Sequence, residues 1–321
     1  MQKTVAIGSL TLKNRVFLAP MAGITNLPMR LMARQQGASL TFTEMVSVNG
    51  LTREGKKSFE LLKSAPADRP MGMQLFGDDP QMLAEAARLV EGYGELIDIN
   101  MGCPVRKVVA TGAGSALLKE PLKVADIVSC VRRATKLPFT VKIRTGWVCG
   151  DDSFLEIGRI AQEEGCDAVT LHPRSRAQMF EGRADWSRIA ELKGALDIPV
   201  IGSGDLFTPQ DVVAMLKETG CDAVMVARGA MGNPWIFRES LALLSGTEPA
   251  TASAAERCDA VCNHLALFCE MQGDRVALME MRKQLSWYAK GLPGAAQFRA
   301  AVNRIEDTAE LVRAMEGFFH G

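Results

Sequence analysis

Several side chains that could do chemistry lie within or just after short apolar runs of the sequence. Cys103 lies just beyond such a run, His172 lies near the end of another, and Lys142 lies within a third at a position where we expect a strand to finish. A thiol can donate a proton or attack a substrate, an ammonium can stabilise an anion, and an imidazole can move a proton. Each has a simpler explanation when taken singly, because a lone cysteine is usually a buried apolar residue and a strand-end lysine can extend to solvent. Core packing does not require such groups at successive strand ends, so we expect them to meet in one site.

The last two apolar runs end in glycine-rich segments, 202–205 (GSGD) and 228–234 (RGAMGNP). Glycine lets backbone N–H groups approach a phosphate closely, and Arg228 adds a positive charge. The alternative is a pair of tight turns, but the two segments together favour a phosphate site. The segment 111–119 (TGAGSALLK) suggests a dinucleotide-binding fingerprint and fails it, because Leu117 occupies the position of the third glycine.

The elements that must position these groups are apolar runs typical of strands buried on both faces. They recur about every 30 residues, the length of one βα unit. The runs span 15–20, 39–44, 71–76, 96–102, 139–147, 168–173, 198–205 and 222–229. Helical patterns with start and stop signals lie between them, as in 208–220, which begins Thr-Pro and ends in Gly. This alternation predicts a closed (β/α)₈ TIM barrel over residues 1–244.

The last part of the chain has a different pattern. Residues 245–256 form a linker of small residues, and residues 257–317 show the three- and four-residue apolar spacing of helices. The sequence therefore predicts an α/β fold in which the TIM barrel is followed by an all-helical domain, residues 245–321. Residues 274–304 hold six basic and two acidic side chains. A solvated helix face is the simplest explanation, and a surface for a polyanion is the alternative.

Composition excludes several classes of protein. The 321 residues hold 37 basic and 37 acidic side chains, so the net charge of zero excludes a globally basic nucleic-acid binder but not a local basic patch. With 47% hydrophobic and 23% charged residues, the chain is typical of globular proteins. It has no run of about 18 apolar residues that would predict a membrane span. The N-terminus lacks signal-peptide features, so we expect a cytoplasmic protein without a membrane partner.

The eight cysteines are scattered along the chain, which predicts reduced thiols rather than disulfides. Cys258, Cys262 and Cys269 share one helical face, and His264 lies among them. A metal site is the alternative for this group, but its spacing matches no closed zinc pattern. We therefore favour core packing for these cysteines and expect no metal.

Four segments resemble the tRNA-dihydrouridine synthases, most closely the bacterial B-type branch of that family. They are APMAGITNLPMR (19–30), DINMGCPVRKVVATGAGSALL (98–118), VKIRTGW (141–147) and NPWIF (233–237). The resemblance covers nearly the whole chain. It implies an N-terminal barrel that binds FMN and a C-terminal helical bundle that grips tRNA. The implied reaction reduces the C5=C6 bond of specific uridines, with NADPH as a diffusible electron donor.

The resemblance also implies roles for individual residues. Cys103 would donate a proton to C5 after hydride transfer to C6. The cofactor would bind at Pro20, Met21, Ala22, Gln74, Lys142, His172, Ser203, Gly204, Asp205, Ala227, Arg228 and Gly229. The uracil would face Asn100, Arg144 and His172, and Arg174 is expected beside them. If the substrate is an RNA, the basic stretch would hold its phosphates, and we expect these contacts at Arg282, Lys283, Lys290 and Arg299.

The sequence departs from the family pattern at three positions near the expected phosphate. Ser203 stands where the family often has Asn, Pro173 removes a backbone donor after the sixth strand, and Ala227 replaces a Gly. None of these changes alters Cys103 or Lys142. We therefore expect the activity to be kept and only the phosphate geometry to differ.

Three alternative functions share parts of this pattern. They are a small-molecule FMN oxidoreductase of the dihydroorotate dehydrogenase or ene-reductase type, dihydrouridine synthesis in ribosomal RNA, and non-catalytic RNA binding on an inherited barrel. The helical domain disfavours the first, because a metabolite needs no second domain. Intact Cys103, Lys142 and His172 disfavour the last. The sequence leaves tRNA and ribosomal RNA open, and it implies no protein partner, so we expect a monomer.

Overall fold

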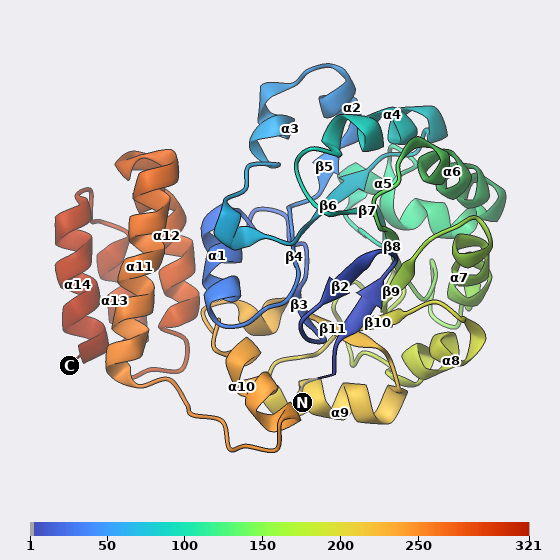
Figure 1. The fold of residues 1–321 in the computed structure, drawn as a ribbon. Coiled ribbons are helices and arrows are strands. Elements are labelled where there is room, and N and C mark those ends of the chain that lie inside the picture. Colours follow the sequence, from blue (N-terminus) through green and yellow to red (C-terminus); the bar gives the residue numbers. More distant parts are fainter. Residues whose placement is uncertain (1–2, 321) are drawn as a thin grey trace.

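Eight parallel strands form a nearly closed barrel in the computed structural model, which describes residues 3–320 (Figure 1). Their order is β3 (Val16–Leu18), β11 (Ala223–Val226), β10 (Val200–Ser203), β9 (Ala168–His172), β8 (Phe139–Arg144), β7 (Leu96–Met101), β6 (Met71–Phe76) and β4 (Thr41–Phe42). The first and last meet through backbone hydrogen bonds from Leu18 N to Leu40 O (2.9 Å) and from Ser39 N to Val16 O (3.1 Å). The predicted TIM barrel is therefore confirmed.

The strands are shorter than the apolar runs that predict them. The run 198–205 gives only four strand residues, because Gly204 and Asp205 adopt φ angles of 120° and 54° that turn the chain out of the sheet. The run 39–44 contributes only β4, and a separate short strand, β5 (Val46–Ser47), pairs with β6. Residues 204 and 205 therefore lie on a loop at the mouth of the barrel.

A β-hairpin that the sequence analysis did not predict closes the other end of the barrel. Its antiparallel strands, β1 (Val5–Ile7) and β2 (Leu10–Leu12), lie across the barrel in Figure 1. Ile7 and Leu12 share one buried cluster with residues at the beginnings of barrel strands, among them Leu96. The open end of the barrel is therefore the end at which the strands finish.

Helices cover the outside of the barrel. They are α1 (Leu27–Gln35), α2 (Val48–Thr52), α3 (Lys56–Glu60), α4 (Pro80–Val90), α5 (Arg106–Val109), α6 (Pro121–Ala134), α7 (Ser153–Glu163), α8 (Ser187–Ala195), α9 (Pro209–Thr219) and α10 (Ile236–Leu244). Of these, α1, α4 and α9 begin at a side chain that caps them. Thr208 and Asp211 form a reciprocal capping box at the start of α9, which ends at Gly220 with φ of 67°. Asp79 caps α4 by accepting a backbone N–H. The start and end of α9 are those that the sequence signals in 208–220 predict.

Within the described residues, four helices after the barrel form a bundle with a buried cluster of its own, at the left of Figure 1. They are α11 (Ala254–Gln272), α12 (Asp274–Tyr288), α13 (Ala295–Val302) and α14 (Thr308–His320). The expected helical segment is interrupted where Gly273, Gly291 and Gly294 adopt positive φ. Trp235 precedes the predicted boundary at residues 244 and 245 but packs in the bundle cluster, so that boundary stays a prediction.

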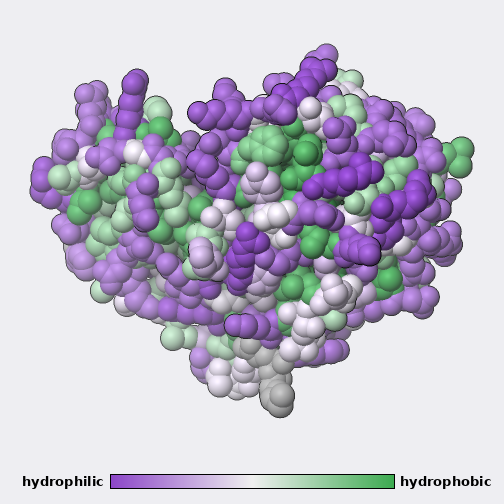
Figure 2. Space-filling model, turned by 45° about the horizontal axis from the view of Figure 1, so that its top comes forward, coloured by the Kyte–Doolittle hydropathy of each residue, from purple (hydrophilic) through white to green (hydrophobic). Residues whose placement is uncertain are grey.

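The described residues offer neither a membrane span nor a metal cluster. No helix among residues 3–320 is both long and apolar enough to cross a bilayer. The same residues contain no group of three or more His, Cys, Asp or Glu side chains that could hold a metal ion. Cys258 is buried in the bundle cluster, and Cys262 and Cys269 pack against it. Hydrophilic side chains cover much of both barrel and bundle on the face drawn in Figure 2.

Candidate active site

A cavity of about 400 Å³ lies at the open end of the barrel, where the strands finish. Most of the side chains that the sequence analysis selected line it. They are Pro20, Met21, Ala22, Asn100, Cys103, Lys142, Arg144, His172, Ser203, Gly204, Asp205, Ala227, Arg228 and Gly229. Gln74 and Arg174 are not part of its wall, and neither are the basic residues of the bundle. The fold thus gathers most of the expected cofactor residues and the thiol around one space.

Lys142 extends from β8 and lines the cavity, opposite Asn100 on β7 in the sheet register. Within residues 3–320, no group accepts a hydrogen bond from its Nζ. Burial and, next, the positive charge of Arg144 lower the pKa of Lys142 to about 8, while Asp98 opposes the shift. The cavity therefore holds a half-buried ammonium that lacks an acceptor within residues 3–320, and a ligand could supply one.

A ladder of buried polar side chains lies next to the cavity. Gln74 donates to Asp98 (Nε2–Oδ2, 2.7 Å) and accepts from Asn100 (Nδ2–Oε1, 2.9 Å). Thr140 donates to the second Asp98 oxygen (2.7 Å). Burial raises the pKa of Asp98 to about 6, although both hydrogen bonds oppose the shift. Gln74 is fully buried and committed to this ladder, so its expected contact with the cofactor stays a prediction.

Asn100 also holds the loop that carries Cys103. Its side-chain oxygen accepts from the N–H groups of Gly102 (3.2 Å) and Cys103 (2.8 Å). The Cys103 carbonyl accepts from the backbone N–H and the hydroxyl of Ser115 (3.1 and 3.0 Å). A Cβ at Gly114 would lie 2.7 Å from that carbonyl. The glycine-rich segment after Cys103 therefore serves as a close support for the thiol loop, not as a dinucleotide fingerprint.

The thiol and the imidazole in the cavity are both neutral at pH 7. Burial raises the pKa of Cys103, although the Val105 N–H and the charges of Arg144 and Lys142 act the other way. Burial also lowers the pKa of His172 well below its usual value, and the surrounding positive charges add to this effect. The cavity therefore contains a protonated thiol that can donate a proton and a histidine that carries no charge.

Arg144 braces the loops around the cavity. It is 3% exposed and donates to the carbonyls of Gly102 (2.9 Å), Ser175 (2.9 Å) and Met179 (2.7 Å). The half-exposed ring of Phe180, a residue that the sequence analysis missed, lies 5.5 Å from its guanidinium. Arg144 thus joins the loops that follow β7 and β9 and keeps a positive charge near the thiol. Its expected contact with the substrate stays a prediction.

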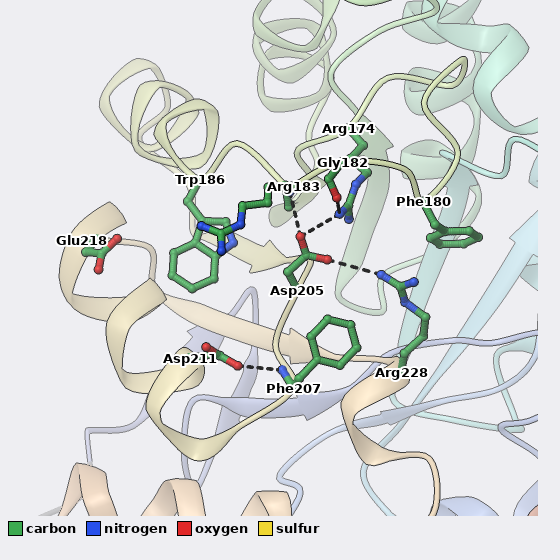
Figure 3. A pocket seen from close by; sticks show the side chains of 11 residues that line it. Arg174, Phe180, Gly182, Arg183, Trp186, Asp205, Phe207, Asp211, Glu218 and Arg228 are labelled. Carbon is green, nitrogen blue, oxygen red and sulfur yellow. Dashed lines mark hydrogen bonds and ion pairs between the residues drawn. The ribbon is translucent and has the colours of Figure 1, made fainter. Parts of the chain in front are cut away.

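Two arginines meet Asp205 at one end of the cavity, as Figure 3 shows. Arg174 Nη2 lies 2.7 Å from Oδ2, and Arg228 Nη2 lies 3.3 Å from Oδ1. Arg174 is only 1% exposed, so its charge balances Asp205 within the protein and its substrate-binding role stays a prediction. The Asp205 carboxylate is likewise engaged. The backbone N–H groups of this loop and Arg228 are what this end offers to a phosphate.

The two glycine-rich loops approach each other too closely for larger residues. A Cβ at Gly229 would lie 2.0 Å from the Leu206 carbonyl oxygen, and Gly204 has a φ of 120° that other residues rarely adopt. Ser203, one of the departures from the family pattern, donates from its hydroxyl to the Met225 carbonyl (3.0 Å). Its side chain therefore links β10 to β11 at the end of the cavity that holds the two glycine-rich loops.

A model of the family described as Dihydrouridine synthase (Dus) matches residues 17–320. The chain belongs to the dihydrouridine synthase family. Two similar proteins are both named tRNA-dihydrouridine synthase B. The one from Pseudomonas aeruginosa is 40% identical, and the alignment covers 98% of this chain and 96% of the relative. The one from Xanthomonas campestris pv. campestris is 44% identical, with 94% and 91% covered. The resemblance noted in the sequence is confirmed.

Two solved structures share the fold of this dihydrouridine synthase at low sequence identity. One, described as a complex of 2-naphthoyl-CoA reductase with 2-naphthoyl-CoA, has a TM-score of 0.60 and 12% identity and covers 76% of this chain and 52% of that chain. The other, described as a variant of NCR from Zymomonas mobilis, has a TM-score of 0.55 and 15% identity. That match covers 79% of this chain and 94% of the other. Identities this low support the barrel fold alone.

Within residues 3–320, some of the basic side chains of the synthase bundle form hydrogen bonds to the protein, and others do not. Lys283 donates to the Gly23 carbonyl (2.7 Å), and Arg282 donates to a carbonyl between α13 and α14 (3.0 Å). Lys290 is exposed and Arg299 is half-buried, and neither side chain has a hydrogen bond or ion pair in the described part of the chain. Lys283 and Arg282 are therefore engaged within the protein, and the expected substrate contacts of all four residues stay predictions.

A second hollow of about 720 Å³ adjoins the synthase cavity and shares part of its wall (Figure 3). Its wall carries as many basic as acidic side chains: Arg174, Arg183, Arg228, Asp205, Asp211 and Glu218. Three of these six already pair with each other through Asp205. Charge therefore selects no class of ligand for this hollow, and we assign it none.

Proposed function

We propose that this synthase reduces the C5=C6 bond of specific uridines in tRNA to 5,6-dihydrouridine, with FMN as cofactor and NADPH as electron donor. The observation that carries the proposal is the presence of Cys103 and Lys142 in the wall of one cavity at the mouth of a barrel. A proton donor and a cation beside one space suit reduction of a conjugated double bond. The printed names of the relatives supply the substrate class.

The cavity suits FMN in size and in the polar groups that it offers. Its volume of about 400 Å³ falls within the range of about 300–1,000 Å³ typical of cofactor pockets. Lys142, which has no acceptor within residues 3–320, would bind the polar edge of the flavin ring. Residues 20–22 would contact the ring. Arg228 and the backbone N–H groups of the two glycine-rich loops would hold a single terminal phosphate.

Reduced FMN, when bound, would supply the hydride that adds to C6 of the uracil. The addition leaves negative charge at C5, C4 and O4, because the C5=C6 bond is conjugated to the C4 carbonyl. Cys103 protonates C5, and burial favours the thiol form that this step requires. The positive charges of Arg144 and Lys142 stabilise the thiolate that remains. Neutral His172 can donate a hydrogen bond to the uracil without competing as an acid.

The cofactor can be identified directly. Because the phosphate end offers Arg228 and two glycine-rich loops, we expect the purified protein to release FMN on denaturation, at about one molecule per chain after reconstitution. Chromatography of the released flavin makes the measurement. Release of FAD, or failure to bind any flavin after reconstitution, would refute the assignment.

The uracil must leave the RNA stack to reach the floor of a barrel, so the protein must hold the RNA around it. The basic stretch 274–304 on the bundle would bind phosphates of the same tRNA. Lys290 and Arg299 are its best candidates, because neither is engaged within the described residues. Lys283 is a poorer test of RNA contact, since it already binds the Gly23 carbonyl.

Reversing Lys290 and Arg299 to Glu should weaken tRNA binding and lower the slope of log affinity against log salt by about 2. NADPH oxidation without tRNA should be unchanged. Filter binding at several salt concentrations makes the measurement. The matched control reverses Lys136 and Arg159, which are exposed on the barrel and form no side-chain hydrogen bond or ion pair within residues 3–320. An equal loss of tRNA affinity in the control variant would contradict the proposal that these bundle residues bind RNA.

A further inference from the structure

The loop between β3 and α1 carries Met21 at the wall of the cavity. It forms a tight turn, because the N–H groups of Ile24 and Thr25 both donate to the Met21 carbonyl (3.0 Å each). Gly23 lies at the exposed tip of this turn with a φ of 70°. The position of the tip therefore depends on what binds the polar groups of Gly23 from outside the turn.

Two charged side chains from different parts of the protein bind Gly23. Glu44, just after β4, accepts a hydrogen bond from the Gly23 N–H. Lys283, on α12 of the bundle, donates from Nζ to the Gly23 carbonyl (2.7 Å), and its ammonium lies 5.3 Å from the Trp287 ring centroid. The loop is thus held by the barrel on one side and by the bundle on the other.

A second loop of the cavity rests on the same helix. A Cβ at Gly232 would lie 2.4 Å from the Trp287 carbonyl carbon and 2.5 Å from the Tyr288 nitrogen, so this loop meets the backbone of α12 directly. Trp235, a few residues on, packs against the Tyr288 ring with centroids 6.2 Å apart. Helix α12 therefore supports both the loop before α1 and the loop that contains Arg228.

We propose that Lys283 is a positioning residue that couples the RNA-binding bundle to the cofactor cavity through Gly23. The inference rests on the proposed function, since it takes FMN as the ligand of the cavity and tRNA as that of the bundle. An ammonium can donate in several directions, so an RNA phosphate near α12 would compete with the Gly23 carbonyl for Lys283. RNA would then change the affinity for FMN, and linkage requires FMN to change the affinity for RNA by the same factor.

Three variants test the contact. Lys283→Met removes the donor and keeps most of the side chain, and Lys283→Arg keeps a donor. Lys136→Met makes the matched change at an exposed lysine whose side chain has no hydrogen bond in the described part of the chain. Amide hydrogen exchange of residues 20–25 is measured in the flavin-free protein. We expect Lys283→Met to accelerate exchange about three- to tenfold, and the other two variants to leave it near the wild-type rate.

FMN affinity, measured by fluorescence titration with and without tRNA, gives the second readout. Lys283→Met should weaken FMN binding about three- to tenfold without RNA, an effect that a lysine acting only as an RNA contact would not produce. It should also abolish the effect of tRNA on FMN affinity. Unchanged exchange at residues 20–25, or unchanged FMN affinity, would overturn the proposal. Accelerated exchange in a protein that binds no FMN would instead overturn the proposed cofactor and support the contact at Gly23.

Discussion

Replacing Cys103 by alanine should slow transfer of reducing equivalents to uracil by about 10²–10⁴-fold, the usual contribution of a positioned general acid. FMN binding, tRNA binding and flavin reduction by NADPH should persist, because the thiol acts only in delivering the proton to C5. Single-turnover oxidation of the pre-reduced enzyme by unmodified tRNA measures the loss. A wild-type rate in Cys103→Ala would leave water or His172 as the proton source.

Two further variants and the pH profile sharpen this test. Cys103→Ser should restore little activity, because a hydroxyl is a far weaker acid than a thiol. Cys149→Ala, at an exposed cysteine outside the cavity wall, should have a mild effect. Because burial raises the pKa of Cys103, the transfer rate should stay level over roughly pH 6–8 and fall only above the raised thiol pKa. If the transfer rate already falls as the pH is raised toward 7, the acid has a lower pKa than this thiol, and that result would contradict the role of Cys103.

The second large effect is expected at Lys142. Lys142→Met should make the free energy of FMN binding less favourable, or raise the activation free energy of flavin reduction. We expect a change of about 1–3 kcal/mol in either quantity, the scale of a lost charge-assisted hydrogen bond. The reason is that the ammonium lines the cavity and has no acceptor within residues 3–320, so a ligand would provide its only partner there. Flavin titration and stopped-flow reduction by NADPH measure the two quantities, with Lys136→Met as control. Unchanged occupancy together with unchanged reduction kinetics would refute the role.

The pH dependence of FMN binding distinguishes the contribution of the Lys142 charge to FMN affinity from the contribution of its side-chain packing. Its pKa of about 8 is below the usual lysine value, so the ammonium is charged below that pH and loses its proton as the pH rises through it. FMN affinity of the wild-type protein should therefore decline above about pH 8. Lys142→Met should lack that decline. The same profile in both proteins would show that the loss of affinity comes from a change in packing.

The barrel and most of its site could be predicted because the relevant signals are local. Continuous apolar runs at intervals of about 30 residues are typical of βα units, and the carboxyl ends of parallel strands meet at one face. That rule alone brings Cys103, Lys142, His172 and Arg228 to one cavity. The expectations of FMN and tRNA had a different source, the resemblance of whole segments to the dihydrouridine synthases.

Contacts between distant parts of the chain could not be predicted from single segments. Lys283 was expected on RNA because it lies in a basic stretch, yet it binds Gly23, 260 residues away, through the docking of the bundle on the barrel. The ladder beside the cavity had a signal that was missed, since Asp98 is an acid inside an apolar run. The strands of the hairpin are three residues each, too short for a clear alternating pattern.

Incubation of the purified protein with FMN, NADPH and tRNA that lacks dihydrouridine is the most direct test of the proposed activity. Mass-spectrometric mapping then locates the reduced positions, with unmodified ribosomal RNA and orotate treated in parallel. We predict dihydrouridine at defined uridines of tRNA, dependent on both FMN and NADPH and strongly reduced in Cys103→Ala. Reduction of ribosomal RNA or of the small molecule, with the tRNA unchanged, would contradict the proposal.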